Sequence, residues 1–226
     1  MDQSNSQQRH TPRSQSLTPV SGGSDDEIGR LRARVGELQR ERDHLIAVVD
    51  ILQEVSSSFY YVNNLEAIAR KLGNAFGLER CTIYLAGDAN HVRLVTSYNE
   101  PSVQNLVVNL KRYPELERAF ESGETVFIPD AGLDPQLRNI KSTLDSRNVG
   151  SIVVVPIRWQ GTVIGAIFLR TDRGAEPFSD ADIRFCQVVA SLTAKVLRNA
   201  HRLETLLRDH RDVLQQLQTT DDEAVR

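Results

Sequence analysis

The chain has 226 residues and a formal net charge of −3, with 40% hydrophobic and 25% charged residues. These values exclude collagen-like and wholly disordered proteins, and the length suits one ordinary domain with extensions. Because Lys and Arg are not in excess, we expect no nucleic-acid partner. The sequence shows no signal-peptide pattern and no apolar run near 18 residues, so we expect a cytoplasmic protein that does not bind or cross a membrane.

The two cysteines, Cys81 and Cys186, form no CxxC pair. Their spacing therefore indicates neither a disulfide framework nor a cysteine zinc site. We expect both to be buried core thiols, because a free cysteine in a fold behaves as a small hydrophobic residue.

The N-terminal part divides into a tail and a helix. Residues 1–24 are rich in Ser, Gln, Pro, Gly and Thr, which predicts a disordered tail. Residues 25–58 carry an a/d heptad pattern that Arg42 interrupts, which predicts a coiled-coil helix and a dimer interface. The interface positions predicted here are Leu31, Val35, Leu38, Leu45, Val49 and Leu52.

The middle of the chain, residues 59–180, shows the pattern of one mixed domain. A helical pattern over 64–76 precedes short β-type runs, and two pairs of these runs are separated by turn residues. We predict an α/β (α+β) domain in which helices pack on an antiparallel sheet. The predicted strands are 80–86, 91–98, 106–110, 125–128, 150–157 and 162–169, and the short helices are 114–122 and 134–147.

A second long helix is predicted over residues 181–220, with a frayed end at 221–226. Ser179 and Asp182 supply its N-terminal capping pattern. Its heptad pattern extends beyond any single domain, so we expect it to pair with the N-terminal helix in a dimeric four-helix bundle. The interface positions here are Leu192, Val196, Leu203, Leu206 and Val213.

Three stretches, 149–158, 161–169 and 178–182, resemble the closing hairpin and last helix of the GAF domain. The resemblance extends over roughly residues 50–200. It implies a small-molecule sensor module of the kind found in bacterial signalling proteins. Residues 112–116 and 121–126 are also similar to GAF modules that precede bacterial signalling enzymes.

The known chemistries of this family find little support in the sequence. Its cyclic-nucleotide branch resembles this chain at Phe178 and Asp182, but Thr171, Asp172 and Ile183 replace the branch's Asn, Lys and Glu. Its methionine sulfoxide reductase branch uses clustered cysteines, which this sequence lacks.

No Cys–His pair is present for a bilin, and a haem ligand would have to be the lone His91. No GxSxG, HExxH, GxxxxGK or GxGxxG sequence occurs either. We therefore predict no catalytic residues, no cofactor and no metal site.

One candidate binding site remains, between the sheet and the middle helices. Asp130, Arg138, Lys141 and Arg147 are the charged residues there that would meet a polar or anionic ligand. The alternative interpretation is that these side chains form a solvated helix face, which the sequence favours slightly.

The leading hypothesis is a non-enzymatic signal-transduction sensor that forms a homodimer and responds to a small ligand or a signalling partner. Polar residues at heptad positions, Arg42, Asn199 and His210, would bring alternative helix registers close in energy. Two alternatives stay open: a sensory part of a diguanylate cyclase or histidine kinase whose catalytic domain would follow Arg226, and a dimerisation adaptor without ligand.

Overall fold

The computed structural model describes residues 22–56, 60–78, 80–88, 90–98, 100, 103 and 105–224. The predicted disordered tail lies outside these residues, except that 22–24 belong to the first helix, α1 (Gly22–Ser56). The chain divides into two compact units, one up to Arg40 and one from Glu41 to Arg226, which we describe separately.

The first unit is the N-terminal part of α1. Its apolar residues Leu31, Val35 and Leu38 are all exposed, and Arg30 forms an ion pair with Asp26 at 2.9 Å. An amphipathic helix that leaves its apolar stripe in water gains little stability by itself. The stripe is therefore available for a helical partner.

The second unit is built on a six-stranded sheet with the order β3-β2-β1-β6-β5-β4. All neighbouring strands are antiparallel, which confirms the predicted sheet. Residues Gln160 and Gly161, with φ of 48° and 85°, form the two-residue turn between the longest strands, as hairpins require. The strands are β1 (Arg80–Ala86), β2 (His91–Ser97), β3 (Leu106–Asn109), β4 (Val126–Ile128), β5 (Val149–Trp159) and β6 (Thr162–Asp172).

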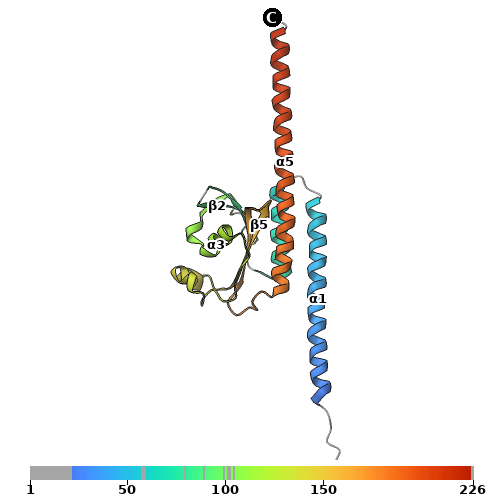
Figure 1. Ribbon diagram of the computed structural model, residues 1–226, viewed down its shortest axis with the longest axis vertical. Helices are drawn as coiled ribbons and strands as arrows, with labels where there is room; N and C mark the ends of the chain where they lie inside the picture. Colours follow the sequence, from blue (N-terminus) through green and yellow to red (C-terminus); the bar gives the residue numbers. More distant parts are fainter. Residues whose placement is uncertain are drawn as a thin grey trace, which may run out of the picture. The chain divides into compact units, whose positions relative to one another are not determined.

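Helices cover both faces of this sheet (Figure 1). The long helices α2 (Tyr61–Phe76) and α5 (Asp180–Ala224) lie on one face, and α3 (Pro114–Ser122) lies on the other. The remaining short helices are η1 (Leu110–Arg112), η2 (Pro135–Ile140) and α4 (Lys141–Ser146). No helix in the described part of the chain is long and apolar enough to span a membrane.

Two hydrophobic cores follow from the alternation of side chains along each strand. On β6, Ile167 belongs to the core under α2 and α5, whereas its neighbour Phe168 belongs to the core under α3, η2 and α4. The first core also contains the second half of α1, through the buried Ile51. The sheet thus separates a helical-bundle side from a side covered by short helices.

The predicted helix over 134–147 is in fact two short helices. Asp134 accepts a hydrogen bond at 2.7 Å from the backbone N–H of Gln136, and the tight 3₁₀ turn η2 begins at Pro135. Only Leu137 and Leu144 in these two helices are buried, so little packing holds a continuous α-helix together. The segment therefore follows its local turn chemistry.

The predicted cap of the last helix is confirmed. The backbone N–H and the hydroxyl of Ser179 both donate to Asp182 Oδ2, at 2.8 and 2.7 Å. Asp182 N–H donates in return to Ser179 Oγ at 3.2 Å. This reciprocal pair satisfies backbone donors at the start of α5.

Both cysteines are core thiols, as predicted. Cys81 and Cys186 are free and fully buried in the core under α2 and α5, and burial raises the pKa of each thiol. The thiolate, which is the reactive form, is therefore disfavoured.

We expect neither thiol to react with a water-soluble disulfide reagent in the native protein, and both to react in denaturant. Because exposure requires opening of the core, the labelling rate should rise with denaturant concentration. Time-resolved thiol labelling measures this. Fast labelling of one thiol in native buffer would contradict the burial.

Candidate functional site

A buried carboxyl group lies in the first turn of α3. Pro114 begins this helix, and the buried Leu116 and Ala119 fix it on the sheet. The same packing places the side chain of Glu115 inward, with 2% of the residue exposed. Among the described residues, Glu115 Oε2 has no hydrogen-bond partner. An unsatisfied buried acceptor of this kind is uncommon and requires an explanation.

Burial raises the pKa of Glu115 to about 7. A hydrogen bond from its own backbone N–H and the charge of Arg118 lower the pKa, and the charge of Asp134 raises it further. Burial dominates because a carboxylate loses its hydration in a low-dielectric core. Near neutral pH the group is therefore close to half protonated, and it can either donate or accept a hydrogen bond.

A second buried titratable group, Tyr84, is influenced by Glu115 and by other charged or polar side chains. Burial raises the pKa of Tyr84, and the nearby Tyr113 and Glu115 raise it further, whereas Arg80 and Arg147 lower it. The ring of Tyr84 packs edge-on against Phe168, with centroids 6.4 Å apart. We call Tyr84, Tyr113, Glu115 and Arg147 the Glu115 cluster. It combines an acid, two hydroxyls and a guanidinium at the edge of an apolar core.

The four predicted ligand residues are exposed side chains on the same side of the sheet. Asp130 follows β4, Arg138 lies in η2, Lys141 begins α4 and Arg147 follows it. In the described part of the chain, no ion pair or side-chain hydrogen bond joins any two of them. Arg147 is counted in the Glu115 cluster because its charge lowers the pKa of Tyr84. Their role as ligand residues stays a prediction.

Asp130 has neighbours that the sequence did not indicate. Its Oδ1 accepts a hydrogen bond at 2.8 Å from the backbone N–H of Gly132. Arg173 pairs with Asp145 at 2.6 Å, and Asp145 and Asp130 together raise the pKa of Arg173. Asp130 is therefore already partly compensated by a cation of the chain itself.

Sequence reasoning missed Glu115 and Tyr84. An acidic residue in the first turn of a helix is normally explained by the helix dipole, and Tyr84 fits any strand. The available signal was the helical pattern itself, because Glu115 precedes Leu116 on a short helix whose start is fixed by Pro114.

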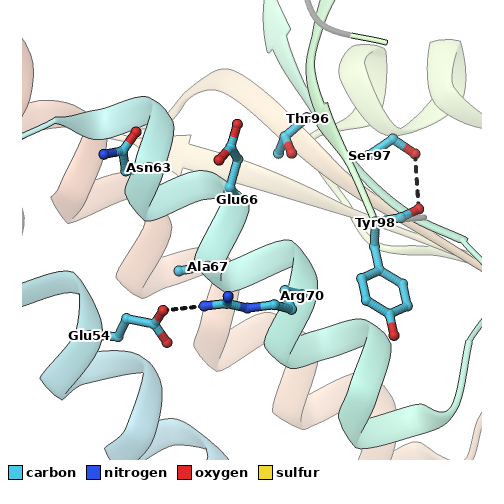
Figure 2. Close-up of a pocket in the computed structure, with 8 residues that line it drawn as sticks. All are labelled: Glu54, Asn63, Glu66, Ala67, Arg70, Thr96, Ser97 and Tyr98. Atoms are coloured by element: carbon cyan, nitrogen blue, oxygen red, sulfur yellow. Dashed lines mark hydrogen bonds and ion pairs between the residues drawn. The ribbon is translucent and has the colours of Figure 1, made fainter. Parts of the chain in front are cut away.

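The opposite side of the sheet holds a hollow of about 540 Å³ between α1, α2 and the end of β2 (Figure 2). Its polar groups are mostly satisfied within the protein. Arg70 pairs with Glu54, the hydroxyl of Ser97 lies 3.2 Å from that of Thr82, and Tyr98 donates to Asn74 Oδ1 at 2.7 Å. This hollow is therefore a weaker candidate than the Glu115 cluster.

Metal ligation finds no support in the described residues, where no three His, Cys, Asp or Glu side chains are grouped to hold an ion. His91 stands half-buried at the start of β2 and lines a small hollow with Glu117 and Glu121. Acidic residues alone do not make a binding site.

An antiparallel sheet with helices packed on both faces defines a two-sided domain of the α/β (α+β) class. The sequence model of the GAF domain matches residues 63–197, more than half of the chain. The chain therefore belongs to the GAF domain family, which confirms the predicted resemblance.

Two curated regulators are similar to the chain. The Nif-specific regulatory protein of Azospirillum lipoferum is 26% identical over 171 residues, which are 73% of this chain and 27% of that protein. The protein of the same description from Azospirillum brasilense is 24% identical over 160 residues, which are 68% of this chain and 25% of that protein. The chain thus spans about a quarter of the length of these relatives.

Solved structures share the fold. The GAF domain of a phosphoenolpyruvate-protein phosphotransferase from Coxiella burnetii has a TM-score of 0.63 at 19% identity, covering 73% of this chain and 98% of that one. Free methionine-R-sulfoxide reductase from Neisseria meningitidis, solved with its substrate, has a TM-score of 0.60 at 20% identity, covering 71% and 91%. At these identities the similarity concerns the fold alone.

Proposed function

We propose that the chain is a cytoplasmic, non-enzymatic sensor module that binds a small polar ligand at the Glu115 cluster. The supporting observation is the buried Glu115 carboxyl group, whose Oε2 has no partner in the described part of the chain. Leaving such an acceptor unsatisfied costs about 1–3 kcal/mol. A ligand with an N–H or O–H group would remove this cost.

The surrounding groups define the ligand chemistry that fits. Glu115, Tyr113 and Arg147 all influence the hydroxyl of Tyr84, so the cluster offers hydroxyls and a positive charge besides the carboxyl group. Arg138 and Lys141, both exposed, add cations on the same side of the sheet. A small molecule with a hydrogen-bond donor at one end and an anionic group at the other would match this arrangement.

A reductase activity like that of the Neisseria relative is not part of the proposal. Cys81 and Cys186 belong to the core under α2 and α5, whereas Glu115 lies on the other face of the sheet. Burial raises the pKa of both thiols, which disfavours the reactive thiolate. We therefore propose regulation rather than catalysis.

The proposal includes a homodimer formed through α1 and α5, with ligand state biasing the helix register. Exposed heptad side chains support this pairing; they are Leu45, Val49, Leu52 and Leu206. Leu192 and Val196 are half-buried, and the side chain of Val213 lies outside the described residues. Exposed apolar stripes of this length are typical of partner-binding helices.

A second candidate function is a sensory part of a longer regulator. The chain corresponds to only about a quarter of the Nif-specific regulatory proteins that it resembles. In such a protein the module would control an attached output domain. The attached output domain could equally be a diguanylate cyclase or a histidine kinase, the two alternatives that the sequence leaves open.

Native mass spectrometry of the purified chain tests the sensor proposal. We expect a dimer that carries extra mass, and we expect Glu115→Gln to lose that mass because it weakens the acceptor at the site. Glu121→Gln, an exposed change on the same helix, should keep it. An empty wild-type dimer would favour the adaptor without ligand, and a monomer would contradict the helical pairing.

A further inference from the structure

A hollow of about 250 Å³ lies between α5 and the ends of β1, β5 and β6. Trp159, the last residue of β5 before the hairpin turn, is one of its lining residues. The side chains that matter for the argument are Arg93, Trp159, Ile164, Leu197, Arg198 and His201.

A second hollow of about 300 Å³ continues from the first one along α5. It shares Arg198 and His201 with the first hollow and extends to Arg202 and Leu206. From Leu197 to Leu206, α5 advances about 13 Å at the usual helical rise. We call the two hollows together the Trp159 groove. Its length along one helix distinguishes it from a compact pocket.

The Trp159 groove is positively charged. Arg93, Arg198, Arg202 and His201 line it, and its lining contains no Asp or Glu. Within the described residues, none of these three arginines forms an ion pair. The positive charges are therefore available to an anionic partner, and a groove lined by one sign of charge attracts the opposite sign.

Apolar surface lies directly beside these charges. Leu85, Ile164 and Leu197 are half-buried in the first hollow, and Leu206 is 64% exposed in the second. The guanidinium of Arg198 lies 5.8 Å from the centroid of the Trp159 ring. Trp and Arg are the residues that most often supply binding energy at protein interfaces.

We propose that the Trp159 groove binds an acidic amphipathic segment of a partner protein. An apolar side chain of that segment enters the first hollow against Trp159 and Ile164, and its carboxylates pair with Arg93, Arg198 and Arg202. The first hollow is smaller than an ordinary ligand pocket of about 300–1,000 Å³, and the second is at the lower limit of that range. Two small hollows in a row suit successive anchors of a peptide or helix better than one compact molecule.

The first hollow is separate from the proposed dimer interface, whereas the second hollow contains Leu206, one of the predicted interface positions. The heptad of α5 places Val196, Asn199 and Leu203 at a and d, so Leu197, Arg198 and His201 fall at b, c and f. The first hollow thus lies outside the helix–helix interface. It also lies on the opposite side of the sheet from Glu115, and a partner there would contact α5 where the helix leaves the domain.

Trp159 provides a direct readout, because it is the only tryptophan in the chain. The probe is a synthetic amphipathic helical peptide of Glu and Leu heptads, titrated into the full chain while tryptophan fluorescence is followed. We expect a saturable change that weakens as salt is added. A peptide with Lys in place of every Glu should give none.

The variants locate the binding. We expect the double variant Arg93→Ala/Arg198→Ala to bind the acidic peptide about tenfold or more weakly than the wild type, since a desolvated charge pair is lost at each position. Arg202→Glu, an exposed change that leaves Trp159 untouched, should weaken it as well. Arg184→Ala removes an exposed arginine elsewhere on α5 and should leave binding unchanged. Circular dichroism checks that each variant is folded.

Four results would overturn the proposal. The first is that the acidic peptide causes no saturable change in tryptophan fluorescence. The second is that the Lys peptide causes an equal change. The third is that Arg202→Glu and the wild type bind the acidic peptide with equal affinity. The fourth is a fluorescence change that depends on the concentration of the chain alone and disappears in Arg202→Glu, which would make a second copy the occupant. A saturable response to benzoate without one to the peptide would identify a small organic anion instead.

Discussion

Glu115→Gln should make the protein more stable at pH 8 and should leave its stability at pH 4.5 nearly unchanged. The wild-type carboxyl group has a pKa of about 7 in the folded state, above the ordinary value of 4.5. Between pH 4.5 and about pH 7, the folded chain holds a proton on Glu115 that the unfolded chain has released. Wild-type stability therefore falls as pH rises through this window and levels off above about pH 7.

The size of the effect follows from the shift in pKa. A raised pKa of this extent corresponds to a loss on the order of 3 kcal/mol across the window. Glutamine has nearly the same shape and carries no charge, so it removes this dependence. Because Glu115 is almost fully buried, little solvent screening reduces the effect.

Urea unfolding at pH 4.5, 6, 7 and 8 measures the difference between the two proteins. Glu121→Gln is the matched control, since Glu121 is exposed on the same helix. The Glu115→Gln curve should separate from wild type as pH rises, while the Glu121→Gln curve should follow wild type. Parallel curves for all three proteins would show that burial does not perturb Glu115.

The stability result also bears on the proposed ligand. A buried, unsatisfied carboxyl group that destabilises the empty protein is a common cost of a binding site. If Glu115→Gln both stabilises the protein and removes the ligand mass, the same group accounts for both. A stabilised variant that still carries the ligand would place the ligand elsewhere on the protein.

Most of the sheet could be predicted because its strands carry local signals. The run of apolar residues over 150–157, the turn at Gln160 and Gly161, and the run over 162–169 together predict the central hairpin. The structure extends these strands to Trp159 and Asp172. Here propensity, pattern and turn chemistry agree, so little tertiary information is needed.

The segment 134–147 could not be predicted in detail. Its capping signal at Asp134 and Pro135 indicates a helix start, but the pattern does not distinguish a 3₁₀ turn from an α-helix. Only Leu137 and Leu144 pack into the core here, and that limited burial involves residues far along the chain, so the sequence alone does not show that local turn chemistry prevails.

The candidate sites were harder to predict from the sequence than the secondary structure. Glu115 and Arg147 both act on the hydroxyl of Tyr84, although they lie in different elements, about 30 residues apart in the sequence. The Trp159 groove likewise joins Arg93 of β2 to Arg198 of α5. Contacts of this range leave no spacing signal in a single sequence, so charged residues could be named but not assembled.

His44 joins the second half of α1 to the start of α5. Its ring stacks on Phe185 with centroids 4.5 Å apart and an interplanar angle of 10°, and it meets Phe76 edge-on at 5.7 Å. His44 Nε2 also lies 3.3 Å from Oδ1 of Asp182, the residue that caps α5. A change in the position of α1 relative to α5 would therefore alter this contact.

His44→Ala should destabilise the domain by about 2–4 kcal/mol, because it removes a stacked, largely buried ring and leaves a cavity beside Phe185. His44→Phe keeps the stacking and loses only the contact with Asp182, so we expect a loss below about 1 kcal/mol. Urea unfolding measures both, with the exposed His201→Ala, which lies outside the predicted helix–helix interface, as control. Equal losses for His44→Ala and His44→Phe would show that the contact with Asp182, rather than ring packing, holds α1 to the start of α5.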